Sequence, residues 1–184
     1  MSERLPWTGR AMARLARLRV ALGFACGALV LWLAEPTAGS VMAGGAVACV
    51  GEAIRIWAAG HLHKAREVTS SGPYQWSAHP LYVGSSVMGA GLAIASSRAI
   101  VATMIAAYLI VALTVAARTE EGFLRRAFGD SYDRYRRGDA AADRGGARGR
   151  RFSLAQAMAN HEHRALIGLV LAMLLLALKA AGHV

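Results

Sequence analysis

The sequence has few cysteines and lacks the short motifs by which many soluble enzymes are identified. Two of its 184 residues are cysteines, Cys26 and Cys49. Both fall inside apolar runs, so they indicate no disulfide framework and are typical of small apolar packing residues. No Gly-rich phosphate loop follows a strand, and neither a Gly-x-Ser-x-Gly nor a His-Glu-x-x-His motif occurs. These absences argue against the common nucleotide-binding, serine hydrolase and metalloprotease sites.

Long runs without charge are what the sequence has instead. Hydrophobic residues make up 55% of the chain, and the mean hydropathy of +0.36 is high for a soluble domain of this length. Several uncharged runs are long enough, or nearly so, to cross ~30 Å of hydrocarbon. We therefore predict an all-α integral membrane protein with a single membrane domain over residues 1–184. The predicted spans lie near 18–34, 39–59, 80–97, 99–117 and 165–180.

The positive charge of +10 is distributed in a way that indicates membrane topology. Five Arg lie in residues 1–19, two basic residues in 60–79 and eleven Arg in 118–164, whereas the alternate connections hold only Arg98 and Lys179. This alternation predicts a cytoplasmic N-terminus and an outward C-terminus in a bacterial inner membrane. The same basic residues would attract anionic lipid headgroups, so we expect membrane lipids as partners and no nucleic acid.

The connections between the spans differ in composition. The first 17 residues have the spacing of an amphipathic helix that lies on the inner leaflet. Residues 96–98 are too few for anything but an antiparallel hairpin. After the fourth span, residues 118–137 predict a charged helix, residues 138–150 a flexible low-complexity linker, and residues 151–164 an amphipathic interfacial helix.

Two features lie inside the predicted spans. Glu52 and Arg55 are three residues apart, so they are neighbours on one helix face and predict either a buried ion pair or the wall of a site. The third span is rich in small residues, which let helix backbones approach closely in lipid; helix packing alone would account for them. These residues are Gly84, Ser85, Ser86, Gly89, Ala90, Gly91, Ala93 and Ala95.

His79 and Pro80 mark the start of the third span. Proline is favoured in the first turn of a helix and keeps the preceding residue extended. This predicts that the His79 ring and the unpaired amides of the helix start lie together at the membrane boundary, where the amides would accept an anionic group. Tyr82 lies on the next turn and serves either this site or the membrane interface.

Two adjacent carboxylates, Glu120 and Glu121, directly follow the fourth span, with Arg118 before them. Neighbouring positions on a helix point about 100° apart, so we expect the two carboxylates not to share one small target from the same face. One would hold an ammonium or a ribose hydroxyl while the other fixes an arginine or a backbone group. The alternative is an ordinary solvated helix start.

The remaining histidines do not predict a metal site. His61 and His63 point apart on a helix, no third ligand has a suitable spacing, and the predicted cytoplasmic loops contain no cysteine. His161 and His163 are better placed for contact with lipid headgroups.

The combined motifs resemble one family of membrane enzymes. The pattern is Gly-Pro-Tyr, five residues, Pro-x-Tyr-x-Gly, a helical hairpin, and Arg-x-Glu-Glu-x-x-Leu-x-x-x-Phe-Gly-x-x-Tyr-x-x-Tyr. In this sequence it reads Gly72, Pro73, Tyr74, Pro80, Tyr82, Gly84, Arg118, Glu120, Glu121, Leu124, Phe128, Gly129, Tyr132 and Tyr135. It resembles the isoprenylcysteine carboxyl methyltransferase-like family, which is related in plan to the phospholipid N-methyltransferases.

The resemblance implies a methyltransferase core over residues 50–137 that uses S-adenosylmethionine and a lipophilic acceptor. The cofactor would lie against the cytoplasmic ends of spans three and four, with His79 and Arg118 as catalytic residues. The implied cofactor-binding residues are Tyr74, His79, Tyr82, Gly84, Gly89, Gly91, Glu120 and Glu121.

One departure from the family pattern leaves the acceptor open. Ala78 stands where relatives carry Arg before His-Pro, which weakens the case for carboxyl methylation, although Arg66 or Arg118 would substitute for the missing charge. Carboxyl, amine and thiol acceptors all stay possible from the sequence. The alternatives are a nicotinamide-dependent membrane reductase of similar plan, which would need basic residues for phosphate, and a non-catalytic membrane protein on the same scaffold.

Overall fold

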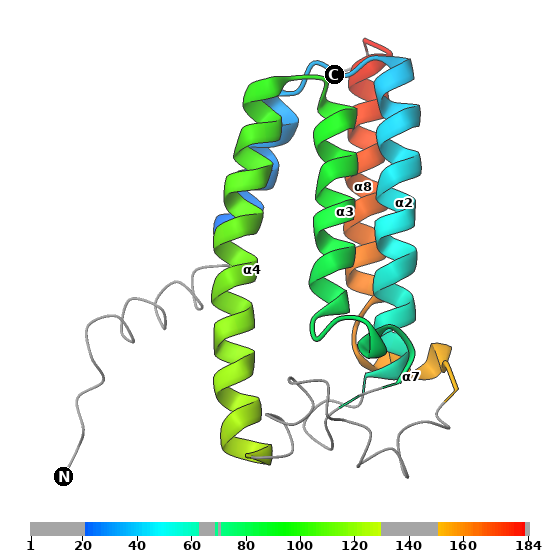
Figure 1. The fold of residues 1–184 in the computed structure, drawn as a ribbon. Coiled ribbons are helices and arrows are strands. Elements are labelled where there is room, and N and C mark those ends of the chain that lie inside the picture. The colour runs from blue at the N-terminus through cyan, green and yellow to red at the C-terminus, as the bar shows by residue number, and fades with distance from the viewer. Residues whose placement is uncertain (1–20, 63–68, 70, 130–150, 183–184) are drawn as a thin grey trace, which may run out of the picture.

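The regular structure is entirely helical in the parts of the chain that the computed structural model describes, residues 21–62, 69, 71–129 and 151–182. Figure 1 shows α2, α3 and α8 running side by side, while α4 stands to one side of them. In chain order the helices are Ala21–Leu33, α2 (Ala38–His61), the 3-10 helix η1 (Gly72–Gln75), α3 (Pro80–Ser96), α4 (Ala99–Phe128), α7 (Leu154–Ala159) and α8 (His163–Ala180).

All five predicted apolar runs form helices, which confirms the all-α membrane protein. Among the described residues three helices are long and apolar enough to cross a membrane: Ala38–His61, Ala99–Ala127 and His163–Ala180. The other two, Ala21–Leu33 and Pro80–Ser96, are apolar but shorter. At 1.5 Å per residue α3 is about 26 Å long, slightly less than the ~30 Å of a hydrocarbon core.

The hairpin between α3 and α4 forms as its length predicts. Pro80 occupies the first turn of α3, and Ser97 ends the helix in the left-handed region with φ of 55° while its N–H donates to Ile94 O. Arg98 then caps α4 in an extended conformation. Two residues, Ser97 and Arg98, therefore connect the helices, and α3 and α4 run antiparallel.

The C-terminal part of α4 carries the charged segment predicted to follow the fourth span. The fourth span and the charged segment after it are one continuous helix, α4, which ends at Gly129 with φ of +49°. Helix-forming residues such as Glu120, Leu124 and Arg125 extend it beyond the apolar run. The predicted interfacial helix over 151–164 is also shorter, since α7 covers six residues. The predicted amphipathic segment 1–17, the linker 138–150, Tyr132 and Tyr135 lie outside the described residues.

Small residues bring α2 and α3 into backbone contact. A Cβ atom on Gly51 would lie 2.7 Å from Gly84 O, and one on Gly91 would collide with the backbone of Ala48 and Gly44. Such close approach is how helices associate in lipid, where apolar surface alone gives little driving force. The pair α2 and α3 therefore forms the rigid part of the bundle.

One end of the bundle is built around the last turn of α2, the start of α3 and α7 (Figure 1); we call it the His79 end. Asn160 Nδ2 donates to Ala59 O (2.8 Å) and to Leu62 O (2.9 Å), and Gln156 Nε2 also donates to Leu62 O (2.9 Å). Ala59 O also accepts from the N–H of Leu62, the C-cap residue of α2, so the segment carrying α7 adds side-chain donors to the end of that helix. The last turn of α8 lies at the opposite end (Figure 1).

Candidate functional site

A pocket of about 530 Å³ lies at the His79 end, between η1, the start of α3 and the C-terminal half of α4. Its size is typical of small-molecule sites. The pocket is lined by Leu62, Tyr74, Ala78, His79, Pro80, Leu81, Tyr82, Ala116, Thr119, Glu120 and Phe123. Four of the predicted site residues, Tyr74, His79, Tyr82 and Glu120, are thus brought together by the fold.

His79 lies between two carboxylates. Its Nδ1 is 3.7 Å from Glu120 Oε2, and its Nε2 is 3.4 Å from Glu121 Oε1. Tyr82 stacks on the His79 ring with the ring centroids 5.2 Å apart and the planes inclined by 19°. The Tyr82 hydroxyl donates to Glu120 Oε2 at 2.7 Å, so the four side chains form one connected cluster across α3 and α4.

This arrangement favours the protonated form of His79. The carboxylate of Glu120, followed by that of Glu121, raises the pKa of His79 above its usual 6.5, although burial acts in the opposite direction. An imidazolium carries an N–H on each nitrogen, and here each nitrogen has its own carboxylate. The cluster therefore stabilises the protonated ring relative to an isolated imidazole.

Glu120 and Glu121 approach the His79 ring at different nitrogens, so they do not meet it from the same face. Two of the amides at the start of α3 have partners within the chain. The His79 N–H donates to Ser77 Oγ (3.2 Å), and the Tyr82 N–H donates to His79 O (3.0 Å).

The loop before α3 fixes Tyr74 in the pocket wall. Tyr74 is 8% exposed and sits in η1, which follows Gly72. Gly72 has φ of +58°, and a Cβ atom there would lie 2.7 Å from Nδ1 of the buried His61. Only glycine meets both requirements without strain. The Gly-Pro-Tyr motif thus anchors the loop to the end of α2.

Other predicted site residues lie elsewhere. Gly84 faces α2, where a Cβ atom would lie 2.6 Å from Arg55 Cγ, and Gly91 also faces α2. Gly89 faces Leu109 on α4. None of these three glycines lines the pocket around His79. Arg118 is exposed on α4 and does not line it either.

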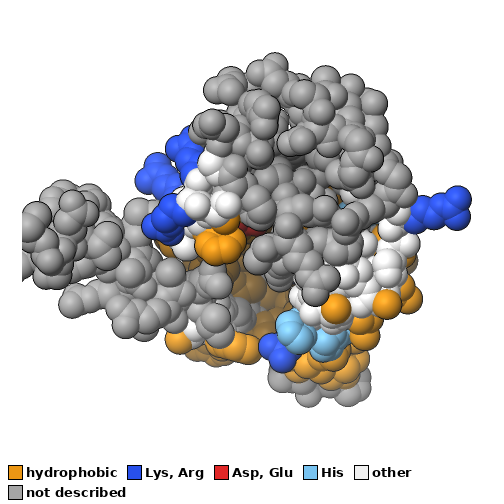
Figure 2. Space-filling model, turned by 90° about the horizontal axis from the view of Figure 1, so that it is seen from below, with side chains coloured by type: hydrophobic (Ala, Val, Ile, Leu, Met, Phe, Trp, Pro, Cys, Tyr) orange, Lys and Arg blue, Asp and Glu red, His pale blue; other side chains and the backbone are white. Residues whose placement is uncertain are grey.

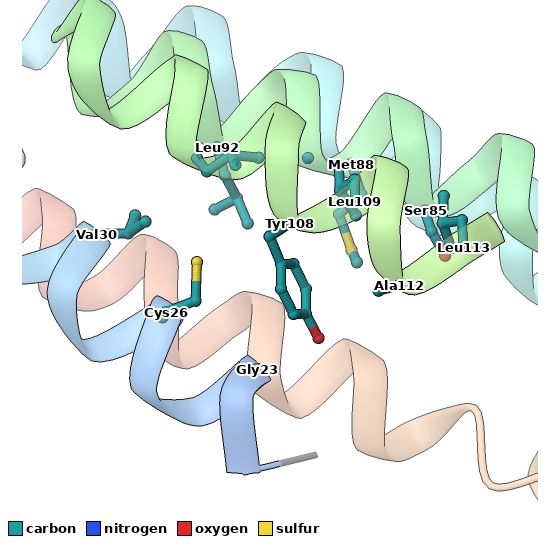
Figure 3. A pocket seen from close by; sticks show the side chains of 13 residues that line it. Gly23, Cys26, Val30, Ser85, Met88, Leu92, Tyr108, Leu109, Ala112 and Leu113 are labelled. Atoms are coloured by element: carbon teal, nitrogen blue, oxygen red, sulfur yellow. The ribbon is translucent and has the colours of Figure 1, made fainter. Parts of the chain in front are cut away.

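A second cavity, of about 360 Å³, lies farther along the same pair of helices (Figure 3). It is enclosed by α3, α4 and the helix Ala21–Leu33, and Tyr108 extends across it with its hydroxyl group beside Gly23. Sequence reasoning missed this cavity. The spacing of Ile105, Leu109 and Ala112 was a signal that one face of α4 is buried. Nothing in the sequence said which helix would cover it.

An ion cluster lies behind α3 at the same end. Arg55 Nε is 3.5 Å from Glu52 Oε2, as the spacing predicted, but Arg55 Nη2 is closer to Glu162 Oε1, at 2.6 Å. The same guanidinium donates to Ser85 Oγ. The pair is therefore one part of a larger cluster that joins α2, α3 and the start of α8. Glu162 was missed because its residue type alone gave no reason to single it out.

Seen from the His79 end, Lys and Arg side chains project at the edge of the molecule (Figure 2). The exposed Arg125 and Arg126 in the last turn of α4 belong to this end. Within the described residues, no group of three His, Cys, Asp or Glu side chains is arranged to hold a metal ion.

Comparison with known proteins identifies one relationship. The family model described as phospholipid methyltransferase matches residues 18–131, a range that contains the whole cluster around His79 and all the residues that line the second cavity. No curated protein matches the chain, and no solved structure does. The match confirms the predicted kinship with membrane methyltransferases. The isoprenylcysteine carboxyl methyltransferase-like branch stays a prediction.

Proposed function

The chain belongs to the phospholipid methyltransferase family, and we propose that it transfers a methyl group from S-adenosylmethionine to a lipophilic acceptor at the pocket around His79. The observation that carries this proposal is the cluster of His79, Tyr82, Glu120 and Glu121 at the end of an apolar bundle. Such a placement gives access to a water-soluble cofactor from one side and to a lipid from the other.

The residues of the pocket fit the cofactor. S-adenosylmethionine carries an ammonium group, ribose hydroxyls and a sulfonium cation, and when bound it supplies an activated methyl group. The carboxylate of Glu120 suits the ammonium or a ribose hydroxyl. The rings of Tyr74 and Tyr82 suit the sulfonium, because aromatic faces attract cations. The volume of about 530 Å³ is within the range of cofactor sites.

The charge of the pocket favours an amine acceptor over a carboxylate. Glu120 and Glu121 place two carboxylates around His79, whose ring offsets at most one negative charge. No Lys or Arg is among the described residues that line the pocket, and Ala78 lies in its wall. A carboxylate acceptor would face uncompensated repulsion there, whereas an ammonium headgroup would be attracted. The same lack of basic residues disfavours the nicotinamide-dependent reductase.

The side chains of the pocket would orient the acceptor and take up the proton of its amine nitrogen. An amine attacks only when its nitrogen is neutral, so a group must take up its proton. His79 performs this step in its neutral form, while Glu120 and Glu121 hold the ring in position. The other contribution is alignment and exclusion of water by Tyr74, Tyr82 and the lipid-facing helices. Arg118, exposed outside the pocket, has no part in this proposal.

The same arrangement supports the proposed topology. The basic residues Arg125 and Arg126 lie at the His79 end, and the last turn of α8 lies at the opposite end (Figure 1). By the positive-inside rule the site is then cytoplasmic and the C-terminus outside, in a bacterial inner membrane.

Calorimetric titration of the detergent-purified protein with S-adenosylmethionine tests the proposal. Glu120→Gln should weaken binding about 10- to 100-fold, because a charge-assisted hydrogen bond to the cofactor is lost. Glu35→Gln, at the opposite end of the bundle, is the matched control and should bind as the wild type does. Equal affinity in all three proteins would overturn the cofactor site.

The acceptor is tested separately with vesicles that contain phosphatidylethanolamine or a prenylated cysteine, using transfer of a labelled methyl group. We expect transfer to the amine lipid. Transfer only to the prenylated cysteine would overturn the argument from charge and leave the cofactor site standing.

A further inference from the structure

The polar pocket and the apolar cavity lie on the same faces of two helices. On α4 the pocket is lined by Ala116, Thr119 and Glu120, and the cavity by residues three to eleven positions before Ala116. Spacings of three and four residues place side chains on one helix face. On α3, Tyr82 lines the pocket and Ser85, about one turn later, lines the cavity. The cavity therefore follows the pocket along these helix faces into the apolar part of the bundle, although the two share no lining residue.

The cavity is apolar and closed at its far end. Its polar groups are limited to the hydroxyls of Ser85 and Tyr108 and the thiol of Cys26. Buried Val30 and Ile105 close the far end, where they pack with other apolar residues of the core. From Leu113 to Ile105 the cavity extends over eight residues of α4, about 12 Å. This is close to one leaflet of the ~30 Å hydrocarbon core.

The cavity reaches the surface of the bundle at Gly27. Gly27 lines the cavity and is itself exposed. A Cβ atom at Gly27 would meet nothing within 4 Å, whereas one at Gly23, a helical turn earlier, would lie 2.6 Å from Tyr108 Oη. Gly27 is therefore a position in the cavity wall at which a Cβ atom would meet no other atom.

We infer that this cavity receives a single hydrocarbon chain of the acceptor, and that the absence of a side chain at Gly27 sets the length of chain accepted. The inference rests on the proposed function, since it assumes that the headgroup lies in the pocket around His79. A volume of about 360 Å³ with one closed end has room for one chain. The second chain of a phospholipid would stay in the bilayer. The cavity thereby selects the acceptor by tail length as well as by headgroup.

The first test compares methyl transfer to lysophosphatidylethanolamines of increasing tail length. Gly27→Leu should lower the ratio of kcat/KM for long tails over short tails about tenfold or more, because added side-chain carbons occupy the far part of the cavity. Gly168→Leu is the matched control, since Gly168 is also an open, exposed helical glycine but lies on α8 away from the cavity. It should keep the wild-type ratio. An equal ratio in Gly27→Leu and Gly168→Leu would overturn the inference.

The second test needs no catalytic activity. A lysophosphatidylethanolamine with a photoreactive diazirine at the tail end is crosslinked to the protein, and the labelled peptides are identified by mass spectrometry. We expect labels beside Cys26 or Leu92, lost in Gly27→Leu and kept in Gly168→Leu. Labels confined to outward-facing positions would overturn the inference. Cavity labelling without methyl transfer to any acceptor would instead reject the proposed function and keep the tail site.

Discussion

The hydroxyl of Tyr82 on α3 donates a 2.7 Å hydrogen bond to Glu120 on α4. At the other end of these two helices the connection is only two residues, Ser97 and Arg98, so their separation there is fixed by the chain. At the His79 end no short connection exists, and the contact between Tyr82 and Glu120, with His79 beside it, joins the two helices across the pocket. The side chains proposed to bind the cofactor thus also hold their own pocket together.

A double-mutant cycle measures the strength of this contact. Tyr82→Phe and Glu120→Gln should each destabilise the protein. Their combined effect should be smaller than the sum by about 0.5–1 kcal/mol, because Tyr82→Phe removes the donor of a partly exposed hydrogen bond and Glu120→Gln removes the charge of its acceptor. Thermal unfolding in detergent gives the free energies. Strict additivity would show that the two side chains do not interact in the folded protein.

The titration of His79 has a defined direction. Because Glu120 and Glu121 raise its pKa, ring protons observed by NMR should titrate above the ordinary value of 6.5. The stabilisation that accompanies the protonated ring is fully present below pH 6.5 and is lost as the pH rises through the raised pKa. Glu120→Gln should move the pKa downward. A wild-type pKa at or below 6.5 would contradict the geometry of the cluster.

The contact between α2 and α3 should be intolerant of even one methyl group. Gly91→Ala places a Cβ atom against the backbone of α2 and should cost about 2 kcal/mol in the free energy of unfolding. Gly168→Ala is the control. It meets open space and should be neutral or stabilise α8 by up to about 1 kcal/mol. If both variants unfold alike, close packing is not what these glycines provide.

The ion cluster around Arg55 predicts a large difference between two acidic residues. Glu162→Ala removes one carboxylate of a buried cluster and should cost about 3 kcal/mol, because the guanidinium loses its nearest ion-pair partner. Glu35→Gln removes the exposed pair with Arg98 and should cost less than about 1 kcal/mol. Denaturation in detergent compares the two. Similar losses would argue that the cluster is not shielded from water.

Much of the fold follows from the order of residues along the chain. Uncharged runs leave the backbone no alternative to internal hydrogen bonds in lipid, so each became a helix. Pro80 set where α3 begins, and the three residues 96–98 allowed only a hairpin. The spacing of Glu52 and Arg55 gave their contact, because a helix brings such positions together whatever surrounds it.

Only the tertiary structure decided which faces meet. Gly89 and Gly91 are two residues apart, yet one faces α4 and the other α2, so their shared motif carries no shared role. Glu120 and Glu121 converge on one ring because His79 arrives between them from another helix. The sequence determined each helix and the chemistry at its ends through local periodicity and hydropathy. The pocket, the cavity beside Gly27 and the partner of Glu162 depend on distances between segments far apart in the chain, which local spacing does not encode.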